Sequence, residues 1–351
     1  MKTVLVEDSA GMVLVHDLTQ IIPGVVKGAR FKKGHIIRPE DIPVLHSMGK
    51  ERIFVMEAQP GMVHEDEAAA TLARLCMGPG VYSAPPSEGK IELFAETDGL
   101  FNADTGAIQA INELGELAVV IRRPAVYARK GDKLGAVKAI PLFIEEAKLV
   151  QARSCAEQTN DGTFKGLLSI VPFTVQNACI VVTGSEIAGG RIPDSFTPVL
   201  EAKLKLYGIT VLRRFVVEDG IENITAAIAD AKAALAAETS GGLILCTGGM
   251  SVDPDDNTPG AIRQSGANVV CYGAPIFPGA MFMLAYFDDG APIAGLPGCV
   301  MFAKTTVFDV VLPRLAAGVR LTQKDFACMA IGGLCLNCSP CRFPICPFGS
   351  F

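Results

Sequence analysis

The chain has 351 residues, enough for two or three domains that each bury a core of their own. Half of the residues are hydrophobic, 19% are charged and the net charge is −6, a composition that excludes a largely disordered protein. The negative charge also argues against non-specific nucleic-acid binding, which needs clustered positive charge. No apolar run reaches the roughly 18 residues of a membrane-spanning helix and no export signal is visible, so we expect a cytoplasmic protein without a membrane segment.

The first part of the chain predicts two small modules. Short β-type runs separated by turn residues favour a β-rich module over residues 1–60. Acidic residues at the start of HEDEAAATLARLCMG, with Gly78 at its end, predict a helix. β-type runs then return as far as Ile140, so we expect residues 61–165 to form a helix plus a barrel-like or sandwich-like module. The polar segment Gln151–Gly166 predicts a linker.

From residue 170 onward, strand-like and helix-like patterns alternate. The apolar runs ACIVVTG, ITVLRRFVV and GLILCT predict buried strands, and amphipathic stretches follow them. The turn DDG lies between two further β-type runs and predicts a hairpin, and a last helix is predicted over Cys299–Ala317. This alternation predicts a three-layer α/β domain over residues 170–320, with a doubly wound, mostly parallel sheet.

Three glycine-bearing loops follow apolar runs in this domain. They are Thr183–Asp194, Thr247–Pro259 and Gly295–Val300. Parallel strands would bring these loops to one edge of the sheet, where open α/β folds bind ligands. Helices predicted to start near Ser195, Pro259 and Cys299 would direct free N–H groups toward a phosphate there. Carboxylates that could hold Mg²⁺ or orient a polar ligand are Glu186, Asp194, Asp253, Asp255 and Asp256.

Each loop taken alone also has an ordinary structural explanation. Thr258 and Pro259 form a normal helix N-cap and first helical residue, and Asp194 with Ser195 could be only a cap. The Asp-Pro and Asp-Asn steps of the second loop are common turn initiators. The combination of all three loops at one edge is what favours a binding site.

The loop motifs resemble the molybdenum cofactor biosynthesis domain shared by molybdopterin adenylyltransferases and molybdopterin molybdenumtransferases. The matching residues, in order, are Thr183-Gly184-Ser185-Glu186, Gly190-Arg191-Ile192-Pro193-Asp194-Ser195, Thr247-Gly248-Gly249, Asp256-Asn257-Thr258-Pro259 and Gly295-Leu296-Pro297-Gly298. The resemblance implies binding of molybdopterin, a pterin dithiolene with a terminal phosphate, or of its adenylylated form. The β-rich modules ahead of the domain make the whole chain more similar to the molybdenumtransferase.

The resemblance and the loop positions together give a candidate site. The predicted binding residues are Thr183, Gly184, Ser195, Thr247, Gly248, Gly249, Ser251, Asp253, Thr258, Gly295, Pro297 and Gly298. The predicted catalytic residues are Asp194, Asp256 and Glu186, with carboxylates holding Mg²⁺. A molybdenumtransferase would exchange the AMP of adenylylated molybdopterin for molybdate. The resemblance also implies a homodimer whose site borrows residues from the partner's N-terminal half.

Several departures from the family pattern leave other functions open. Cys299-Val300 stands where the transferase has Asn-Pro, and Ala280 and Met281 stand where it has lysines. Asp255 stands where the adenylyltransferase has an arginine. Fewer cations would weaken phosphate and molybdate stabilisation, since a charge-assisted contact contributes roughly 1.5–3 kcal/mol. A non-catalytic carrier, chaperone or sensor of molybdopterin is therefore an alternative to the enzyme, and a molybdopterin adenylyltransferase is a further one.

The tail over residues 328–351 is rich in cysteine. Cys335, Cys338, Cys341 and Cys346 have the spacing C-x₂-C-x₂-C-x₄-C, with Pro347 after the last one. This spacing is one residue longer than a ferredoxin run that holds iron–sulfur clusters, and four thiolates would also suit a structural Zn²⁺. We therefore predict a metal site, either an iron–sulfur cluster or zinc. The alternative is a loose terminus with incidental cysteines.

Overall fold

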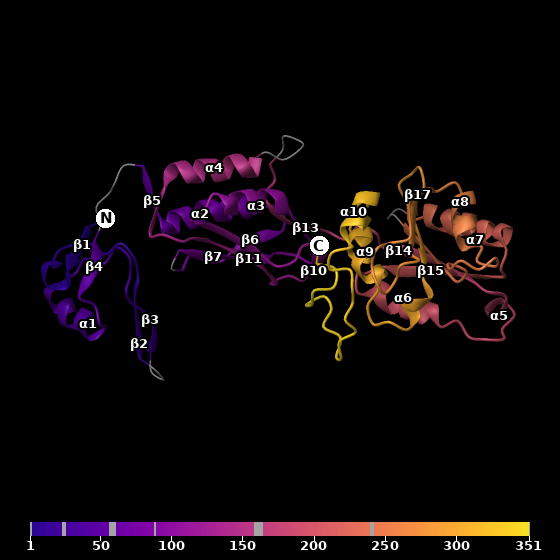
Figure 1. The fold of residues 1–351 in the computed structure, drawn as a ribbon, viewed down its shortest axis with the longest axis horizontal. Helices are drawn as coiled ribbons and strands as arrows, with labels where there is room; N and C mark the ends of the chain where they lie inside the picture. Colours follow the sequence, from indigo (N-terminus) through magenta and orange to yellow (C-terminus); the bar gives the residue numbers. More distant parts are fainter. Residues whose placement is uncertain are drawn as a thin grey trace. The chain divides into compact units, whose positions relative to one another are not determined.

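The computed structural model describes residues 2–22, 26–55, 61–87, 89–157, 164–238 and 242–350. Its contacts divide the chain into two compact units, drawn from indigo to yellow in Figure 1. Unit 1 comprises Met1–Glu96, Ala103–Arg122 and Lys130–Ser169, and unit 2 comprises Thr97–Asn102, Arg123–Arg129 and Ile170–Phe351. Within the described ranges, no helix has the length and apolar character needed to cross a membrane.

The N-terminal residues of unit 1 have the predicted β-rich character. β1 (Lys2–Leu5) pairs antiparallel with β4 (Arg52–Val55), and β2 (Leu18–Ile22) pairs antiparallel with β3 (Val26–Phe31). α1 (Ile42–Ser47) and the short turn η1 (Val6–Asp8) contribute Leu45 and Val6 to an apolar cluster, and the short turn η2 (Pro39–Asp41) directly precedes α1. The division of unit 1 into modules at residue 60 stays a prediction.

The rest of unit 1 differs from the predicted barrel or sandwich. It has an open four-stranded antiparallel sheet in the order β6-β7-β11-β9, a two-stranded pair β5-β12, and three helices. The bounds are β5 (Met62–His64), α2 (Glu65–Cys76), β6 (Val81–Ser83), β7 (Lys90–Ala95), α3 (Thr105–Glu113), β9 (Leu117–Ile121), β11 (Lys133–Ala139), β12 (Phe143–Glu145) and α4 (Glu146–Glu157). Helix α2 confirms the predicted helix.

Helices α3 and α4 were not predicted, because each buries few large apolar side chains. α3 buries Ile108 and Ile111, and α4 buries Leu149 with two alanines. α4 runs through the first half of the predicted linker Gln151–Gly166, and residues 158–163 of that linker lie outside the described residues. α2 and α3 contact the strands of the four-stranded sheet, and α4 packs on both of these helices.

Unit 2 contains the predicted doubly wound domain. Its six-stranded sheet has the order β15-β14-β16-β19-β18-β17, and β15, β14, β16 and β19 are parallel. β18 pairs antiparallel with both neighbours, which confirms the hairpin at the DDG turn. The bounds are β14 (Asn177–Thr183), α5 (Ser185–Ala188), α6 (Phe196–Lys205), β15 (Thr210–Val217), α7 (Ile221–Ala236), β16 (Gly242–Thr247), α8 (Thr258–Gln264), β17 (Asn268–Tyr272), β18 (Met283–Tyr286), β19 (Pro292–Leu296), η3 (Gly298–Met301), α9 (Val307–Ala316) and α10 (Gln323–Cys328).

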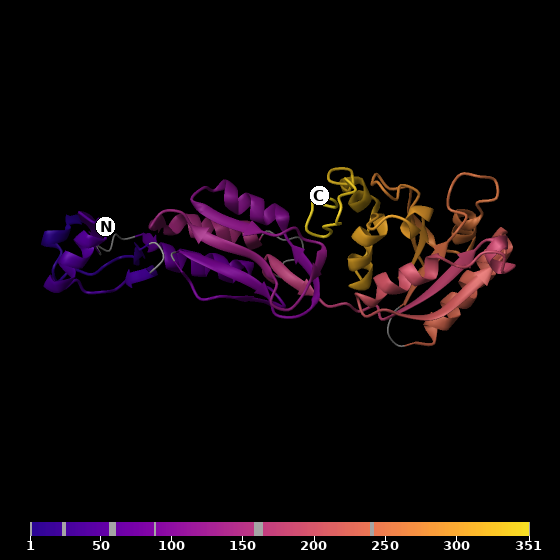
Figure 2. The same ribbon diagram turned by 90° about the horizontal axis from the view of Figure 1, so that it is seen from below.

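Alternating side chains of β14 and β16 divide the core of unit 2 into two layers. Ile180 and Leu245 pack with α6, α9 and α10 on one face, whereas Val181 and Ile244 pack with α7 and α8 on the other. Figure 2 shows helices on both sides of this sheet. Every residue of both strands is buried, as expected for parallel strands covered on both faces. The domain is therefore a three-layer α/β fold. A three-stranded sheet, β10 (Val126–Ala128)-β8 (Gly99–Ala103)-β13 (Leu168–Val171), precedes it.

The predicted last helix begins later than the sequence indicated. Cys299 lies in the short turn η3, and α9 starts at Val307. A capping box sets this start: Thr306 accepts a hydrogen bond from the backbone of Phe308, and Asp309 accepts one from the backbone of Thr306. The prediction of a helix N-terminus at Cys299 is wrong for that reason.

A buried histidine in unit 1 makes stability depend on pH. His64 is 6% exposed and caps α2, its Nδ1 accepting from the backbone N–H of Asp66, while Lys33 Nζ lies 2.9 Å from the same nitrogen. Its Nε2 donates to the carbonyl oxygen of Val15. Burial, and then the nearby charge of Lys33, hold the pKa of His64 below its ordinary value of 6.5.

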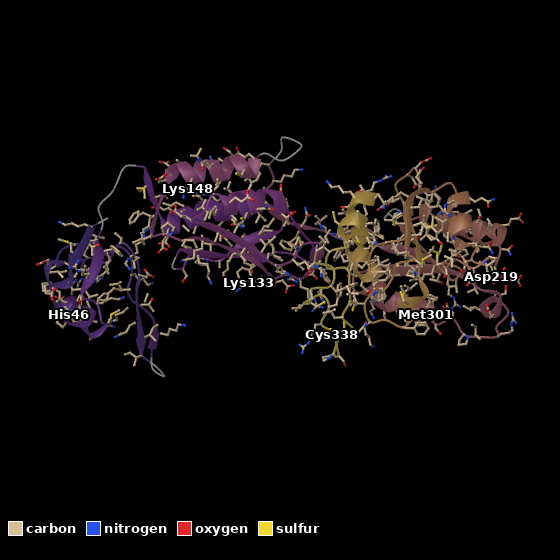
Figure 3. All side chains as sticks on the ribbon, viewed as in Figure 1. His46, Lys133, Lys148, Asp219, Met301 and Cys338 are labelled. Atoms are coloured by element: carbon tan, nitrogen blue, oxygen red, sulfur yellow. The ribbon has the colours of Figure 1, made fainter. Side chains whose placement is uncertain are left out.

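We predict that unit 1 loses stability as the pH falls below about 6.5, because the unfolded chain then binds the proton that folded His64 resists. The loss is about 1.4 kcal/mol for each unit by which the pKa is lowered. Urea unfolding followed by circular dichroism at about pH 7.5 and about pH 5.5 measures it. His64→Gln should reduce this pH dependence, whereas His46→Gln, at an exposed position labelled in Figure 3, should leave it unchanged. An equal pH dependence in wild type and His64→Gln would contradict the assignment.

Candidate functional site

The three predicted loops meet at one edge of the sheet in unit 2. β14 and β16 are parallel neighbours, and β16 also pairs in parallel with β19, so their carboxyl ends face the same way. After β14 the chain returns to β15 on one side, whereas the strands after β16 add to the other side. The carboxyl ends of β14 and β16 are therefore a topological switch point, the usual ligand-binding position of such a fold.

Threonine side chains join the carboxyl ends of these two strands. Thr183 Oγ1 donates to the carbonyl oxygen of Thr247 at 3.1 Å, and Thr258 Oγ1 donates to the carbonyl oxygen of Gly248 at 2.8 Å. The hydroxyls of Thr183 and Thr258 lie 3.5 Å apart. The buried hydroxyl of Thr247 has no hydrogen-bond partner among the described residues. An unpaired buried hydroxyl costs roughly 1–3 kcal/mol, a cost more often found at functional sites than elsewhere.

Glycine is required where the second loop leaves β16. Gly248 has a φ of +88°, and a Cβ atom there would lie 2.4 Å from the carbonyl oxygen of Thr183. In β19, a Cβ atom at Gly295 would lie 2.5 Å from the sulfur of Met250. The backbone of the first and second loops is thus packed closely at this edge, and the side chain of Met250 from the second loop packs on β19.

Asp194 works as a helix cap in this structure. Its Oδ1 accepts from the backbone N–H groups of Phe196 and Thr197, and its Oδ2 lies 3.2 Å from the guanidinium of Arg214. Burial opposes ionisation of Asp194, but the hydrogen bonds from Thr197 and Phe196 and the charge of Arg214 hold its pKa below the ordinary value. The first N–H groups of α6 are therefore already satisfied beside Ser195, and the catalytic role of Asp194 stays a prediction.

The structure adds a carboxylate that the sequence analysis missed. Asp219, in the loop after β15, accepts hydrogen bonds at 2.9 Å from both the backbone N–H and the hydroxyl of Ser185. Figure 3 labels Asp219 at the same end of the domain as α5. This contact links the loops after β14 and β15, directly beside Gly184 and the exposed Glu186. The sequence does carry a signal for this carboxylate. The acidic pair Glu218-Asp219 stands before Gly220 at the end of an apolar run, as carboxylates of such a site often do.

The aspartates of the second loop point to solvent. Asp253 and Asp255 are exposed, Asp256 is partly exposed, and Asp256 Oδ2 accepts from the backbone N–H of Asp253 at 3.0 Å. The carbonyl oxygen of Ser251 accepts from the hydroxyl of Tyr272 at 3.2 Å. Over the ranges that the structure covers, no three His, Cys, Asp or Glu side chains converge as a ready metal site. Mg²⁺ usually needs only one or two carboxylates when a ligand supplies phosphate oxygens, which the pair Asp253 and Asp256 could provide.

The third loop contributes a turn rather than a helix. Pro297 precedes η3, and the space beside Gly298 is open, since a Cβ atom on this residue would have no other atom within 4 Å. Cys299 is partly buried there, and burial raises the pKa of its thiol. Of the three predicted helix starts, only those near Ser195 and Pro259 exist in the structure.

The four tail cysteines do not form one cluster. Cys335 and Cys346 are partly buried against the core of unit 2, whereas Cys338 and Cys341 are exposed. Figure 3 labels Cys338 in the yellow tail segment. In the described part of the chain, which includes all four thiols, no three metal-ligating side chains come together. The iron–sulfur or zinc site stays a prediction without support from this arrangement.

Two family models match separate parts of the chain. One, described as "Probable molybdopterin binding domain", matches residues 179–317, and the other, a domain of unknown function, matches residues 3–57. The first match spans all three loops of the candidate site. The second lies within the predicted module 1–60.

Solved structures with some similarity are also found, whereas no curated protein matches the chain. The molybdopterin biosynthesis Mog protein from Mycobacterium ulcerans is 22% identical, with 40% of this chain and 93% of that chain covered and a TM-score of 0.32. A CinA protein of unknown function from Thermoplasma acidophilum is 19% identical, covering 36% of this chain and 89% of that one at a TM-score of 0.30. A molybdenum cofactor biosynthesis protein from Pyrococcus furiosus is 14% identical, covering 91% and 64%, with a TM-score of 0.26.

The family model and the loop motifs, rather than these distant structural similarities, identify the domain over residues 179–317. The family model covers the strands β14 to β19 and the helices between them, and the motifs occupy the carboxyl edge where the fold places a ligand. Residues 179–317 thus form a molybdopterin-binding domain of the molybdenum cofactor biosynthesis family.

Proposed function

We propose that unit 2 binds molybdopterin or its adenylylated form at the carboxyl edge of β14, β16 and β19. The observation that carries the proposal is the junction of Thr183, Thr247, Gly248 and Thr258. Close backbone packing, a left-handed glycine and a buried hydroxyl without a partner among the described residues all occur there. Such a junction offers backbone N–H groups and the hydroxyl of Thr247 to an anionic ligand.

The first and second loops supply the charged groups of the proposed site. Asp253 and Asp256 would hold Mg²⁺ together with phosphate oxygens of the ligand, and Glu186 would orient its polar groups. Bound Mg²⁺ would neutralise charge on the phosphates. Asp194 would act through α6, which its carboxylate caps, and Asp219 would fix the first loop by holding Ser185.

The leading activity is molybdate insertion of the molybdenumtransferase type. In that reaction adenylylated molybdopterin releases AMP and molybdate is bound in its place. The chain's contribution would be to position the two substrates and stabilise charge. The β-rich modules ahead of the domain support this activity over adenylylation.

A non-catalytic molybdopterin carrier is the second candidate. Ala280 and Met281 stand where the resembled transferase has lysines, so the segment after β17 brings no positive charge to the ligand. Two nearby cations are engaged elsewhere, since Arg214 pairs with Asp194 and Lys203 pairs with Asp309. A protein with this charge distribution could retain binding and lack the transfer step.

We predict that Asp256→Asn weakens molybdopterin binding in the presence of Mg²⁺ by roughly 10-fold to 150-fold, the equivalent of one charge-assisted contact. Isothermal calorimetry with anaerobically prepared molybdopterin measures the change. With the metal chelated, the variant should no longer bind more weakly than the wild type, because the carboxylate contributes to binding only through Mg²⁺.

Asp230→Asn is the matched control, since Asp230 is exposed in the second half of α7 and carries the same charge. It should bind like the wild type. Equal binding by wild type and Asp256→Asn with Mg²⁺ would remove Asp256 from the site. No binding by the wild type would overturn the whole proposal.

Complementation separates the enzyme from the carrier. We predict that the chain restores molybdoenzyme activity in a bacterial strain lacking its molybdenumtransferase, and that Asp256→Asn does so less well. The Asp230→Asn variant should complement like the wild type. Failure of the wild type to complement, together with intact molybdopterin binding, would support the carrier and contradict the transferase.

We also propose that the chain forms a homodimer, as the resemblance to the molybdenumtransferase implies. Light scattering at micromolar concentration should give about twice the chain mass of 37.0 kDa. A monomer mass over the same concentration range would exclude a stable dimer.

A further inference from the structure

Two of the four clustered cysteines in the C-terminal tail of unit 2 pack against the core, and the other two are exposed. Cys335 and Cys346 are partly buried against the core, and the backbone N–H of Cys335 donates to the carbonyl oxygen of Phe277 at 2.8 Å. These two cysteines are held as parts of the structure. Cys338 and Cys341 are both exposed and lie in the motif Cys338-Ser339-Pro340-Cys341.

The chain bends between the two exposed cysteines. The bend is at Ser339 and Pro340, so the Cα atoms of Cys338 and Cys341 are closer than the roughly 10 Å of three extended residues. A disulfide needs a Cα separation under about 7 Å, which a bent C-x-x-C segment can reach by small changes. The spacing is the one used by dithiol–disulfide pairs.

Contacts on the C-terminal side fix the position of this segment. Cys341 Sγ lies 3.3 Å from Thr305 Oγ1, and Thr305 is 4% exposed in the loop between η3 and α9. Further along, Phe348 is 2% exposed, and the guanidinium of Arg123 donates to its carbonyl oxygen. The pair is thus presented at the surface by a tail that is packed on the domain, and both cysteines are open to solvent.

We propose that Cys338 and Cys341 are a reversible dithiol–disulfide site that exchanges with low-molecular-weight disulfides such as glutathione disulfide. In a reducing compartment, protein disulfides are usually of this transient kind. Oxidation would also remove the Cys341 thiol from its contact with Thr305, next to the third loop of the ligand site.

The exchange is balanced in two steps. The thiolate of one cysteine attacks a sulfur of glutathione disulfide, which forms a protein–glutathione bond and releases one glutathione thiolate. The thiolate of the other cysteine then attacks the protein sulfur of that bond, which forms the intramolecular disulfide and releases the second glutathione. The two thiol protons pass to the two leaving thiolates, so one glutathione disulfide yields two glutathiones.

Thiol counting on the intact chain tests the proposal. The reduced protein is equilibrated in glutathione buffers of increasing disulfide content, quenched in acid and labelled with a maleimide reagent. After the quenched chain is unfolded for labelling, two of its eleven thiols should be lost without a glutathione adduct, and tandem mass spectrometry should locate one Cys338–Cys341 link. Excess glutathione should restore both thiols.

Single variants separate this site from incidental oxidation. Cys338→Ser and Cys341→Ser should each stop at a glutathione adduct on the remaining cysteine, whereas Cys328→Ser, at another exposed tail cysteine, should form the link as the wild type does. Circular dichroism of each variant confirms that it is folded. Absence of the link at every glutathione ratio, a link to Cys335 or Cys346 instead, or stoichiometric zinc or iron held by the thiols of the isolated protein would each overturn the proposal.

Discussion

The close approach of β14 and β16 at their carboxyl ends determines the geometry of the candidate site. Thr183 Oγ1 reaches the carbonyl oxygen of Thr247, and Gly248 passes so near Thr183 that any side chain would collide with its backbone. The hydroxyl of Thr258 donates to the carbonyl oxygen of Gly248, and this hydrogen bond fixes the start of α8 against the same strands. The first loop, the second loop and α8 therefore share one anchor, and a change at Gly248 would displace all three together.

The sequence predicted this domain well because its strands are buried on both faces. β14 and β16 are apolar throughout, and the helices between them carry their large apolar residues on one side, so the pattern is strong. Helices α3 and α4 were missed because each buries only one or two large apolar side chains. The start of α9 was misplaced because the capping box at Thr306 and Asp309 is a local signal that lies eight residues beyond the Gly298 turn.

The sequence predicted at which edge of the sheet the candidate site lies, but it predicted only some of the contacts within the site. The positions of the loops follow from strand direction, which the sequence pattern indicates. The hydrogen bond between Ser185 and Asp219 joins residues separated by 34 positions. A local sequence pattern can indicate each residue but does not predict that the two pair. Asp194 was predicted from the sequence as a catalytic carboxylate near a metal. In the folded chain its oxygens instead accept hydrogen bonds from the start of α6 and from Arg214.

The proposed ligand is anionic, whereas the loops around the candidate site are rich in carboxylates. The balance of charge therefore limits how tightly the site could bind this ligand. Arg214 and Lys203 are held in ion pairs, and the residues at 280 and 281 carry no charge. Binding of a phosphate beside Asp253 and Asp256 would then be repulsive unless a divalent cation lies between them, because like charges a few ångströms apart destabilise one another. Under the proposed function the metal would enter with the ligand rather than before it, because one or two carboxylates are enough for Mg²⁺ when the ligand supplies phosphate oxygens. In the proposed arrangement the affinity for the pterin would depend on Mg²⁺ through the second loop, while the threonine junction beneath it would provide shape and neutral hydrogen bonds.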